Sequence, residues 1–213
     1  MNTDKNVFMI EEHSNDKELD LYQFTHIRAY HACRPLNIQD YLINGIQTIN
    51  KAQALREALL RIKSDYVDEK KIVQEFSKQW GDFADIHKRV WMAVNKEVLL
   101  TSAGHYLIYG SEFINELAMK LGCRSSLKNA GIPTIFHCDI PLEDISSSTV
   151  MEIETLIMSG YIQDISIAVN EVSSQDIVDY EHPKEVPDPY CYNAKYRPDY
   201  KKLKEMGYIS GKL

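Results

Sequence analysis

Short apolar runs recur along the chain, and polar or turn-forming residues separate them. Runs that are rich in aromatic and β-branched residues are typical of strands, above all where a proline or glycine follows. Runs of this kind predict strands over residues 7–10, 22–31, 105–109, 132–140 and 162–169. In the third run, strand geometry would turn His105, Leu107 and Tyr109 to one face.

Between these runs, apolar residues repeat every three to four positions, as they do in amphipathic helices. The repeats predict helices over residues 37–43, 52–62, 69–80, 83–96, 111–121 and 149–158. Asn37, Asp68 and Ser111 stand where their side chains can cap a first turn, and Thr149 with Glu152 makes a capping box. Local sequence therefore defines where most of these helices begin.

The order of the elements predicts one α+β domain with a small mixed or antiparallel sheet. Consecutive helical segments make residues 50–100 a helical insertion, and residues 1–20 read as a partly ordered leader. Residues 182–213 form a proline- and tyrosine-rich arm that we expect to pack on the domain or on a partner. Because the 213 residues contain no internal repeat, a single domain over residues 1–213 is expected.

Composition narrows the class of protein further. With 44% hydrophobic and 26% charged residues, the chain resembles an ordinary globular protein. Its formal net charge of -7 argues against broad electrostatic binding of nucleic acid, which needs clustered lysine and arginine. No apolar run resembles a secretory signal or approaches the ~18 residues of a membrane span, so we expect a cytoplasmic protein without a membrane partner.

The segment YHACR at residues 30–34 is the first candidate for chemistry. An imidazole and a guanidinium at a strand-to-turn junction can both project toward an anionic or ribose-containing ligand. The alternative is that His31 satisfies a buried carbonyl while Arg34 closes a salt bridge. Cys33 beside Arg34 can have a lowered thiol pKa and act as a nucleophile, although packing in the core is the commoner role of an unpaired cysteine.

The segment YGSE at residues 109–112 is the second candidate. Gly110 permits close approach of a ligand, and the free amides at the start of the following helix can hold an anion. Glu112 can orient a hydroxyl group or act as a base. The alternative is again structural, because Ser111 is a good N-cap and Glu112 complements the helix dipole.

Histidines and cysteines lack the spacing of a metal site. His26, His31, His105 and His137 form no HExxH pattern, and the cysteines, which are far apart, form no CxxC pair. We therefore expect no bound metal ion.

The two candidate segments resemble motifs of the compact bacterial ADP-ribosyltransferases. In that family, a strand carrying His is followed by a short helix and Gly, which is similar to Tyr30-His31-Ala32 leading to Ile43-Asn44-Gly45. The family's second motif is a strand that ends in Tyr and enters a helix, and His105 to Tyr109 followed by Ser111 resembles it. The insertion over residues 50–100 has no counterpart in the resemblance.

The resemblance implies an enzyme that uses NAD as a substrate and transfers ADP-ribose to a protein or nucleic-acid acceptor. It places His31 on the nicotinamide ribose and Tyr109 on the nicotinamide ring, so that the two side chains open onto one cleft. Arg34 and Ser111 would complete the NAD-binding residues.

An acid is required because positive charge develops on the ribose as the glycosidic bond breaks. The family usually presents Glu at the start of a late strand, whereas the matching stretch, residues 161–166, contains Gln163 and Asp164 and no Glu. Asp164 or Glu112 would then supply the carboxylate, or the activity is absent or altered.

Two other functions stay open. One is a non-catalytic binding protein, such as an immunity or regulatory partner, that uses its acidic surface and tyrosine-rich arm for recognition. The other is a metal-independent nuclease or hydrolase with His31 and His105 as an acid–base pair. The sequence also leaves an oligomer possible.

Overall fold

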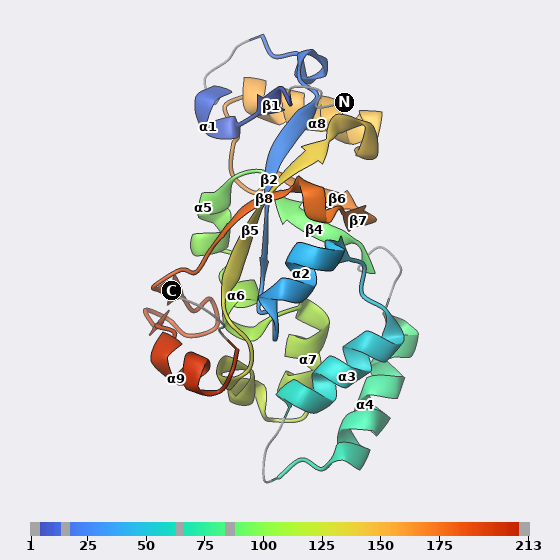
Figure 1. Ribbon diagram of the computed structural model, residues 1–213, viewed down its shortest axis with the longest axis vertical. Coiled ribbons are helices and arrows are strands. Elements are labelled where there is room, and N and C mark those ends of the chain that lie inside the picture. The colour runs from blue at the N-terminus through green and yellow to red at the C-terminus, as the bar shows by residue number, and fades with distance from the viewer. Residues whose placement is uncertain (1–4, 14–17, 63–65, 84–87, 209–213) are drawn as a thin grey trace.

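The computed structural model describes residues 5–13, 18–62, 66–83 and 88–208 of the chain. The protein is a single compact α+β domain built on an antiparallel sheet with the strand order β6-β4-β2-β5-β8, and β1 pairs with β2 in parallel (Figure 1). The strands of this sheet are β1 (Val7–Phe8), β2 (His26–Cys33), β4 (Val90–Ala93), β5 (Thr134–Pro141), β6 (Ser166–Val169) and β8 (Ile177–Glu181). The expected class and small sheet are thus confirmed.

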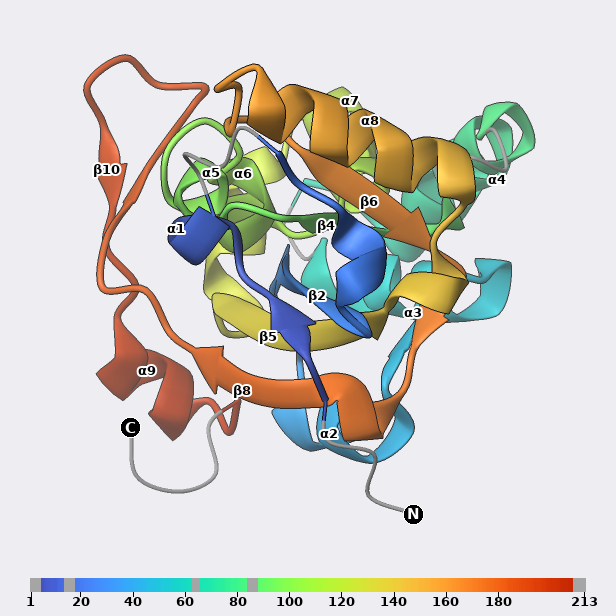
Figure 2. The same ribbon diagram turned by 90° about the horizontal axis from the view of Figure 1, so that it is seen from above.

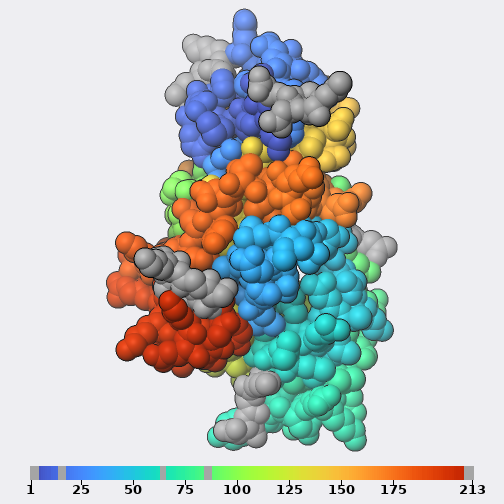
Figure 3. Space-filling view, in the orientation of Figure 1, coloured from blue at the N-terminus to red at the C-terminus, as the bar shows by residue number. Residues whose placement is uncertain are grey.

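Helices cover both faces of the sheet and extend beyond one end of it. They are α1 (Ile10–His13), α2 (Ile38–Asn44), α3 (Lys51–Arg61), α4 (Glu69–Asp82), α5 (Lys96–Leu100), α6 (His105–Tyr109), α7 (Glu112–Lys120), α8 (Ser147–Met158) and α9 (Tyr200–Glu205). Two further two-stranded ladders join β3 (Ile46–Gln47) to β7 (Glu171–Val172) and β9 (Val186–Pro187) to β10 (Lys195–Tyr196). The molecule is elongated, with α1 and β1 near one end and α3 and α4 at the other (Figures 1 and 3).

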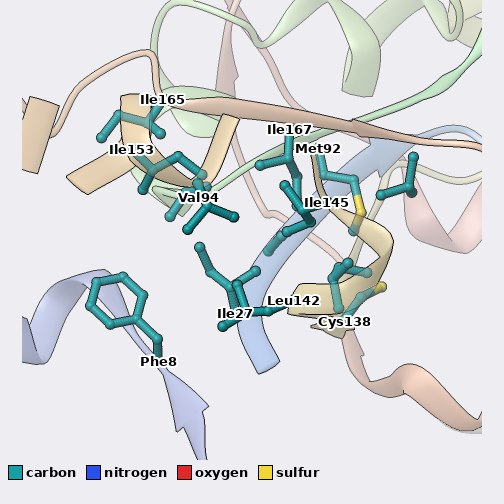
Figure 4. Close-up of a cluster of buried hydrophobic side chains, with 14 of the residues drawn as sticks. Phe8, Ile27, Met92, Val94, Cys138, Leu142, Ile145, Ile153, Ile165 and Ile167 are labelled. Atoms are coloured by element: carbon teal, nitrogen blue, oxygen red, sulfur yellow. The ribbon is translucent and has the colours of Figure 1, made fainter. Parts of the chain in front are cut away.

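The long strand β2 organises the core because successive side chains point to opposite faces of the sheet. Ile27 and Ala29 contribute to one hydrophobic cluster, whereas Tyr30 and Ala32 contribute to the other. The first cluster includes the buried face of α8, which lies along β6 (Figures 2 and 4). The second cluster includes residues of α3, α4, α6 and α7. The sheet therefore carries a core on each face.

Local capping defines three helices as the sequence predicted. The side-chain oxygens of Asn37, Asp68 and Ser111 accept hydrogen bonds from backbone amides of the first turns of α2, α4 and α7. The prediction for α8 was wrong by one turn, since Ser146 is the N-cap and accepts from the amide of Thr149. Ser and Thr are both effective caps, so the pattern alone does not choose between them.

The predicted strand over residues 105–109 is wrong, because this run is helix α6. The amide of Ile108 donates to the carbonyl of Gly104, and the amide of Gly110 donates to that of Tyr106. Gly110, with a φ of 84°, then ends the helix in a conformation that glycine adopts without strain. A short run of buried apolar residues fits a strand and a buried helical turn equally well, so periodicity could not decide between them.

The predicted helix over residues 83–96 is also wrong within its described part, since residues 84–87 lie outside the described residues. Val90–Ala93 forms β4, which pairs with β6 over four consecutive residues. Val90 and Met92 are buried while Trp91 between them is 42% exposed, which is the alternation of a strand. The other predicted elements lie close to their observed bounds, although strands β2 and β6 each begin four residues later than predicted.

Parts of the leader and of the C-terminal arm are ordered elements. Val7–Phe8 forms β1, whereas residues 1–4 and 14–17 of the predicted leader lie outside the described residues. The stretch predicted as loop over residues 182–198 carries the β9–β10 ladder, and α9 follows it. The arm packs on the domain, because Val186 is fully buried in the second cluster.

Candidate functional site

A cavity of about 360 Å³ opens where β2 and β4 separate. Among the described residues, the ladder between β2 and β4 joins Tyr30 to Ala93 alone, whereas β4 remains paired with β6 along its length. Residues 31–34 of β2 and the following turn line one side of the cavity, and residues 89–93 line another. The volume falls within the range of roughly 300–1,000 Å³ that is usual for small-molecule sites.

Five of the predicted site residues line this cavity although they are far apart in the sequence. They are His31, Arg34, Ser111, Glu112 and Asp164. His31 comes from β2, Ser111 and Glu112 from the start of α7, and Asp164 from the turn that precedes β6. The fold therefore brings the candidate acids to the same cavity as the candidate imidazole.

His31 spans the gap between the separating strands. Its Nδ1 lies 3.0 Å from the carbonyl oxygen of Trp91, which can only accept, so Nδ1 carries the proton and donates. Burial lowers the pKa of His31, which keeps the imidazole neutral near pH 7. In a neutral imidazole with a protonated Nδ1, Nε2 is an acceptor. His31 can therefore accept a hydrogen bond from a ligand hydroxyl group in the cavity.

The two predicted carboxylates differ in how they are held. Tyr106 donates to Glu112 Oε1 over 2.7 Å, and Glu112 stands in the first turn of α7. Asp164 accepts from the hydroxyl group of Tyr161 over 3.3 Å and has a φ of 58°. A positive φ is uncommon outside glycine and is a mark of functional or turn positions. The positive φ of Asp164 also interrupts the extended backbone before β6, so β6 is shorter than predicted.

Arg34 is a structural residue in the described geometry, although part of it borders the cavity. Its guanidinium is 1% exposed and donates to the backbone carbonyls of four residues and to the hydroxyl group of Tyr196 at 2.9–3.0 Å. The four carbonyls belong to Leu107, Lys128, Ala130 and Gly131. Because all three nitrogens are engaged, little of the guanidinium remains for the NAD contact that the sequence predicted.

Tyr109 does not line the cavity, so the predicted shared cleft of His31 and Tyr109 is not formed. Its ring is 3% exposed, and its hydroxyl group donates to Asp188 Oδ2 over 2.6 Å. The cationic groups of Arg124 and Lys128 lie 5.1 and 5.2 Å from the ring centroid. Tyr109 thus fastens the C-terminal arm to α6, and the helix turns Tyr106 to the cavity in its place.

The other reactive groups considered from the sequence take no part in this cavity as nucleophile or acid–base pair. Burial raises the pKa of the Cys33 thiol to about 12, so the thiol stays protonated, contrary to the lowered pKa that Arg34 suggested. His105 is not among the residues that line the cavity, and its Nε2 lies 3.7 Å from Glu112 Oε1. The geometry does not pair His105 with His31.

The sequence missed most of the residues that line the cavity, among them Tyr106, Arg89 and Trp91. Tyr106 was placed on the wrong face by the strand interpretation, and Arg89 and Trp91 lay in the segment interpreted as helix. The alternation of buried and exposed residues around Trp91 was the signal that could have identified β4. No signal in the sequence showed that Arg89 would face the same cavity as His31.

Comparison of the chain with protein-family models, with curated proteins and with solved structures gave no match. Among the described residues, no group of three or more histidine, cysteine, aspartate or glutamate side chains is arranged to hold a metal ion. Within the same ranges, every helix is too short or too polar to cross a bilayer.

We expect the free energy of unfolding to fall between pH 6.5 and 5. Burial lowers the pKa of His31, His137 and His182, so the unfolded chain binds more protons than the folded chain below pH ~6.5. Stability is therefore complete above the unfolded pKa and is lost as the pH falls, by up to about 1.4 kcal/mol per pH unit for each histidine that remains neutral. Urea unfolding at pH 7, 6 and 5 measures this change. An unfolding free energy that stays constant or rises on acidification would contradict it.

Proposed function

We propose that the chain is an NAD-using ADP-ribosyltransferase that transfers ADP-ribose to a macromolecular acceptor. One observation carries the proposal: His31, Ser111, Glu112 and Asp164, which come from three separate parts of the chain, line a single cavity of small-molecule size. The resemblance of the segment around His31 to a motif of that enzyme class supports the same assignment. The second motif gives no support, because residues 105–109 form helix α6 and Tyr109 lies outside the cavity. Tyr109 has no role in the reaction proposed here.

Each group has a task that suits its environment. His31 Nε2 accepts a hydrogen bond from a hydroxyl group of the nicotinamide ribose, while Nδ1 holds the ring against Trp91. The carboxylate of Asp164 or Glu112 stabilises the cationic ribose more strongly in the transition state than in the ground state, which accelerates cleavage of the bond to nicotinamide. Tyr106, which lines the cavity, offers an aromatic face to the nicotinamide ring.

Incubation of the purified chain with NAD tests the proposal through two readouts, thermal stabilisation and release of nicotinamide. A ligand at one hundred times its dissociation constant stabilises the folded state by about 2.7 kcal/mol. His31→Asn is the informative variant, because the Asn amide can replace Nδ1–H on the Trp91 carbonyl but supplies nothing at Nε2. We expect this variant to fold and to lose both responses.

His182→Asn is the matched control. His182 also has Nδ1 at 3.0 Å from a backbone carbonyl, that of Pro133, but it does not line the cavity. It should keep the NAD responses of the unchanged chain. If millimolar NAD neither stabilises the chain nor releases nicotinamide, the proposal is wrong.

Stabilisation without release would instead favour a binding protein, the second candidate function. The specific observation in its favour is the composition of residues 161–166, which contain no Glu. Asp164 would then contact the bound ligand without supporting turnover.

A further inference from the structure

Arg89 stands at the wall of the cavity with a buried donor that has no acceptor. It immediately precedes β4 and lines the cavity, and its Nε is buried without a hydrogen-bond partner. The other buried side-chain atoms that lack a partner among the described residues are Gln79 Oε1, Asn115 Oδ1 and His137 Nε2, and none of these residues lines the cavity. Among the described residues that line the cavity, Arg89 is thus the one with a buried side-chain donor that lacks an acceptor.

The other arginines near the sheet differ from Arg89 in this respect. Arg28 pairs with Asp139 at 2.5 Å, and Arg61 pairs with Glu57 at 3.1 Å. Arg34 is saturated by backbone carbonyls. In contrast, none of the ion pairs found within the described ranges includes Arg89. Native proteins rarely leave a buried donor unsatisfied, and exceptions of this kind occur at functional sites.

We propose that Arg89 is the anion-binding residue of the cavity and holds a phosphate group of the ligand. A guanidinium has donors and no acceptor, and its planar edge matches two oxygens of a phosphate group. His31 lines the same cavity, and its Nε2 is an acceptor for a hydroxyl group, so the two residues together select a sugar phosphate. The inference that the bound anion is a phosphate group rests on the proposed function, in which the anion is the diphosphate of NAD.

The arrangement also orients the ligand. His31 lies on β2 and Arg89 at the start of β4, on strands that separate at the cavity. The sugar therefore lies near β2 and its phosphate near the start of β4. Glu112 and Asp164 carry negative charge and would repel a phosphate, so they lie at the cationic ribose and not at the anion.

Calorimetric titration with inorganic pyrophosphate tests this inference without requiring NAD turnover. We expect the unchanged chain to bind pyrophosphate, and Arg89→Gln to bind it at least 10-fold more weakly. Arg89→Lys keeps the charge without the planar edge and should lie between the two. Arg56→Gln is the matched control, since Arg56 is an exposed arginine of α3 that does not line the cavity. Its affinity for pyrophosphate should be unchanged.

Stability provides the second readout. Arg89→Gln removes a buried donor that has no partner, so its unfolding midpoint in urea should not fall below that of the unchanged chain. A large loss of stability would indicate a structural arginine and overturn the inference. Equal pyrophosphate affinity in the unchanged chain and in Arg89→Gln, or no binding to the unchanged chain at millimolar concentration, would also overturn it. Arg89-dependent pyrophosphate binding without any NAD response would sustain the anion site and refute the proposed function.

Discussion

Replacing Arg34 by methionine is expected to lower the free energy of unfolding by about 4 kcal/mol. The guanidinium joins the end of β2 to the loop that contains Lys128, Ala130 and Gly131, and to α6 through Leu107. Methionine fills a similar volume but supplies no donor. The carbonyls of Lys128 and Ala130 also accept from Tyr196 and Arg61, whereas those of Leu107 and Gly131 accept from no other side chain among the described residues. Each buried carbonyl that loses its only partner costs about 1–3 kcal/mol.

Equilibrium unfolding in urea measures the effect. Arg34→Lys should recover only part of the stability, because an ammonium group cannot reach acceptors that surround a planar fork. Arg56→Met, at an exposed position on α3, should change the unfolding free energy by no more than about 0.5 kcal/mol. An Arg34→Met variant as stable as the unchanged chain, but deficient in NAD binding, would restore the ligand-binding role that the sequence predicted.

Replacing Asp164 by asparagine is expected to lower the rate of nicotinamide release by about 10²–10³-fold, with little change in NAD affinity. The effect falls on turnover because the carboxylate acts on charge that appears only as the bond breaks. Asparagine keeps the size of the side chain and tolerates the positive φ of 58°. The measurement is the initial rate of nicotinamide release at saturating NAD, together with the affinity from titration.

Two further variants test whether the backbone conformation of Asp164 matters and which carboxylate carries the charge. Asp164→Gly relieves any strain of the positive φ but removes the acid, so it should be at least as inactive as Asp164→Asn. Glu112→Gln keeps a group that can accept from Tyr106 and tests which carboxylate carries the charge. If Asp164→Asn releases nicotinamide at the unchanged rate while Glu112→Gln is inactive, the acid is Glu112 and the role given to Asp164 is wrong.

The sequence predicted those parts of the fold that depend on local hydrogen bonds. Asn37, Asp68 and Ser111 each bond to an amide two or three residues away, so the cap and the helix start lie in one short segment. Strand β4 and helix α6 were mistaken because their apolar runs are short. Pairing with β6 determines that residues 90–93 form a strand, and packing in the second cluster determines that residues 105–109 form a helix. These contacts join distant parts of the chain.

The same difference between local and long-range contacts explains which parts of the candidate site the sequence identified. His31, Ser111 and Glu112 were identified from local motifs, and the structure brings them together with Asp164. The carbonyls that engage Arg34 lie 73–97 residues further along the chain, and Asp188 lies 79 residues beyond Tyr109. A motif cannot distinguish a side chain committed to such partners from one that is open to a ligand. The role of Arg89 likewise depends on where two strands separate.

Crystals of the chain soaked with NAD will show whether the cavity between β2 and β4 binds this nucleotide. We expect density in the cavity, with a ribose hydroxyl group within hydrogen-bond distance of His31 Nε2. An empty cavity at saturating NAD, or NAD bound on another surface, would mean that the cavity is not the NAD site.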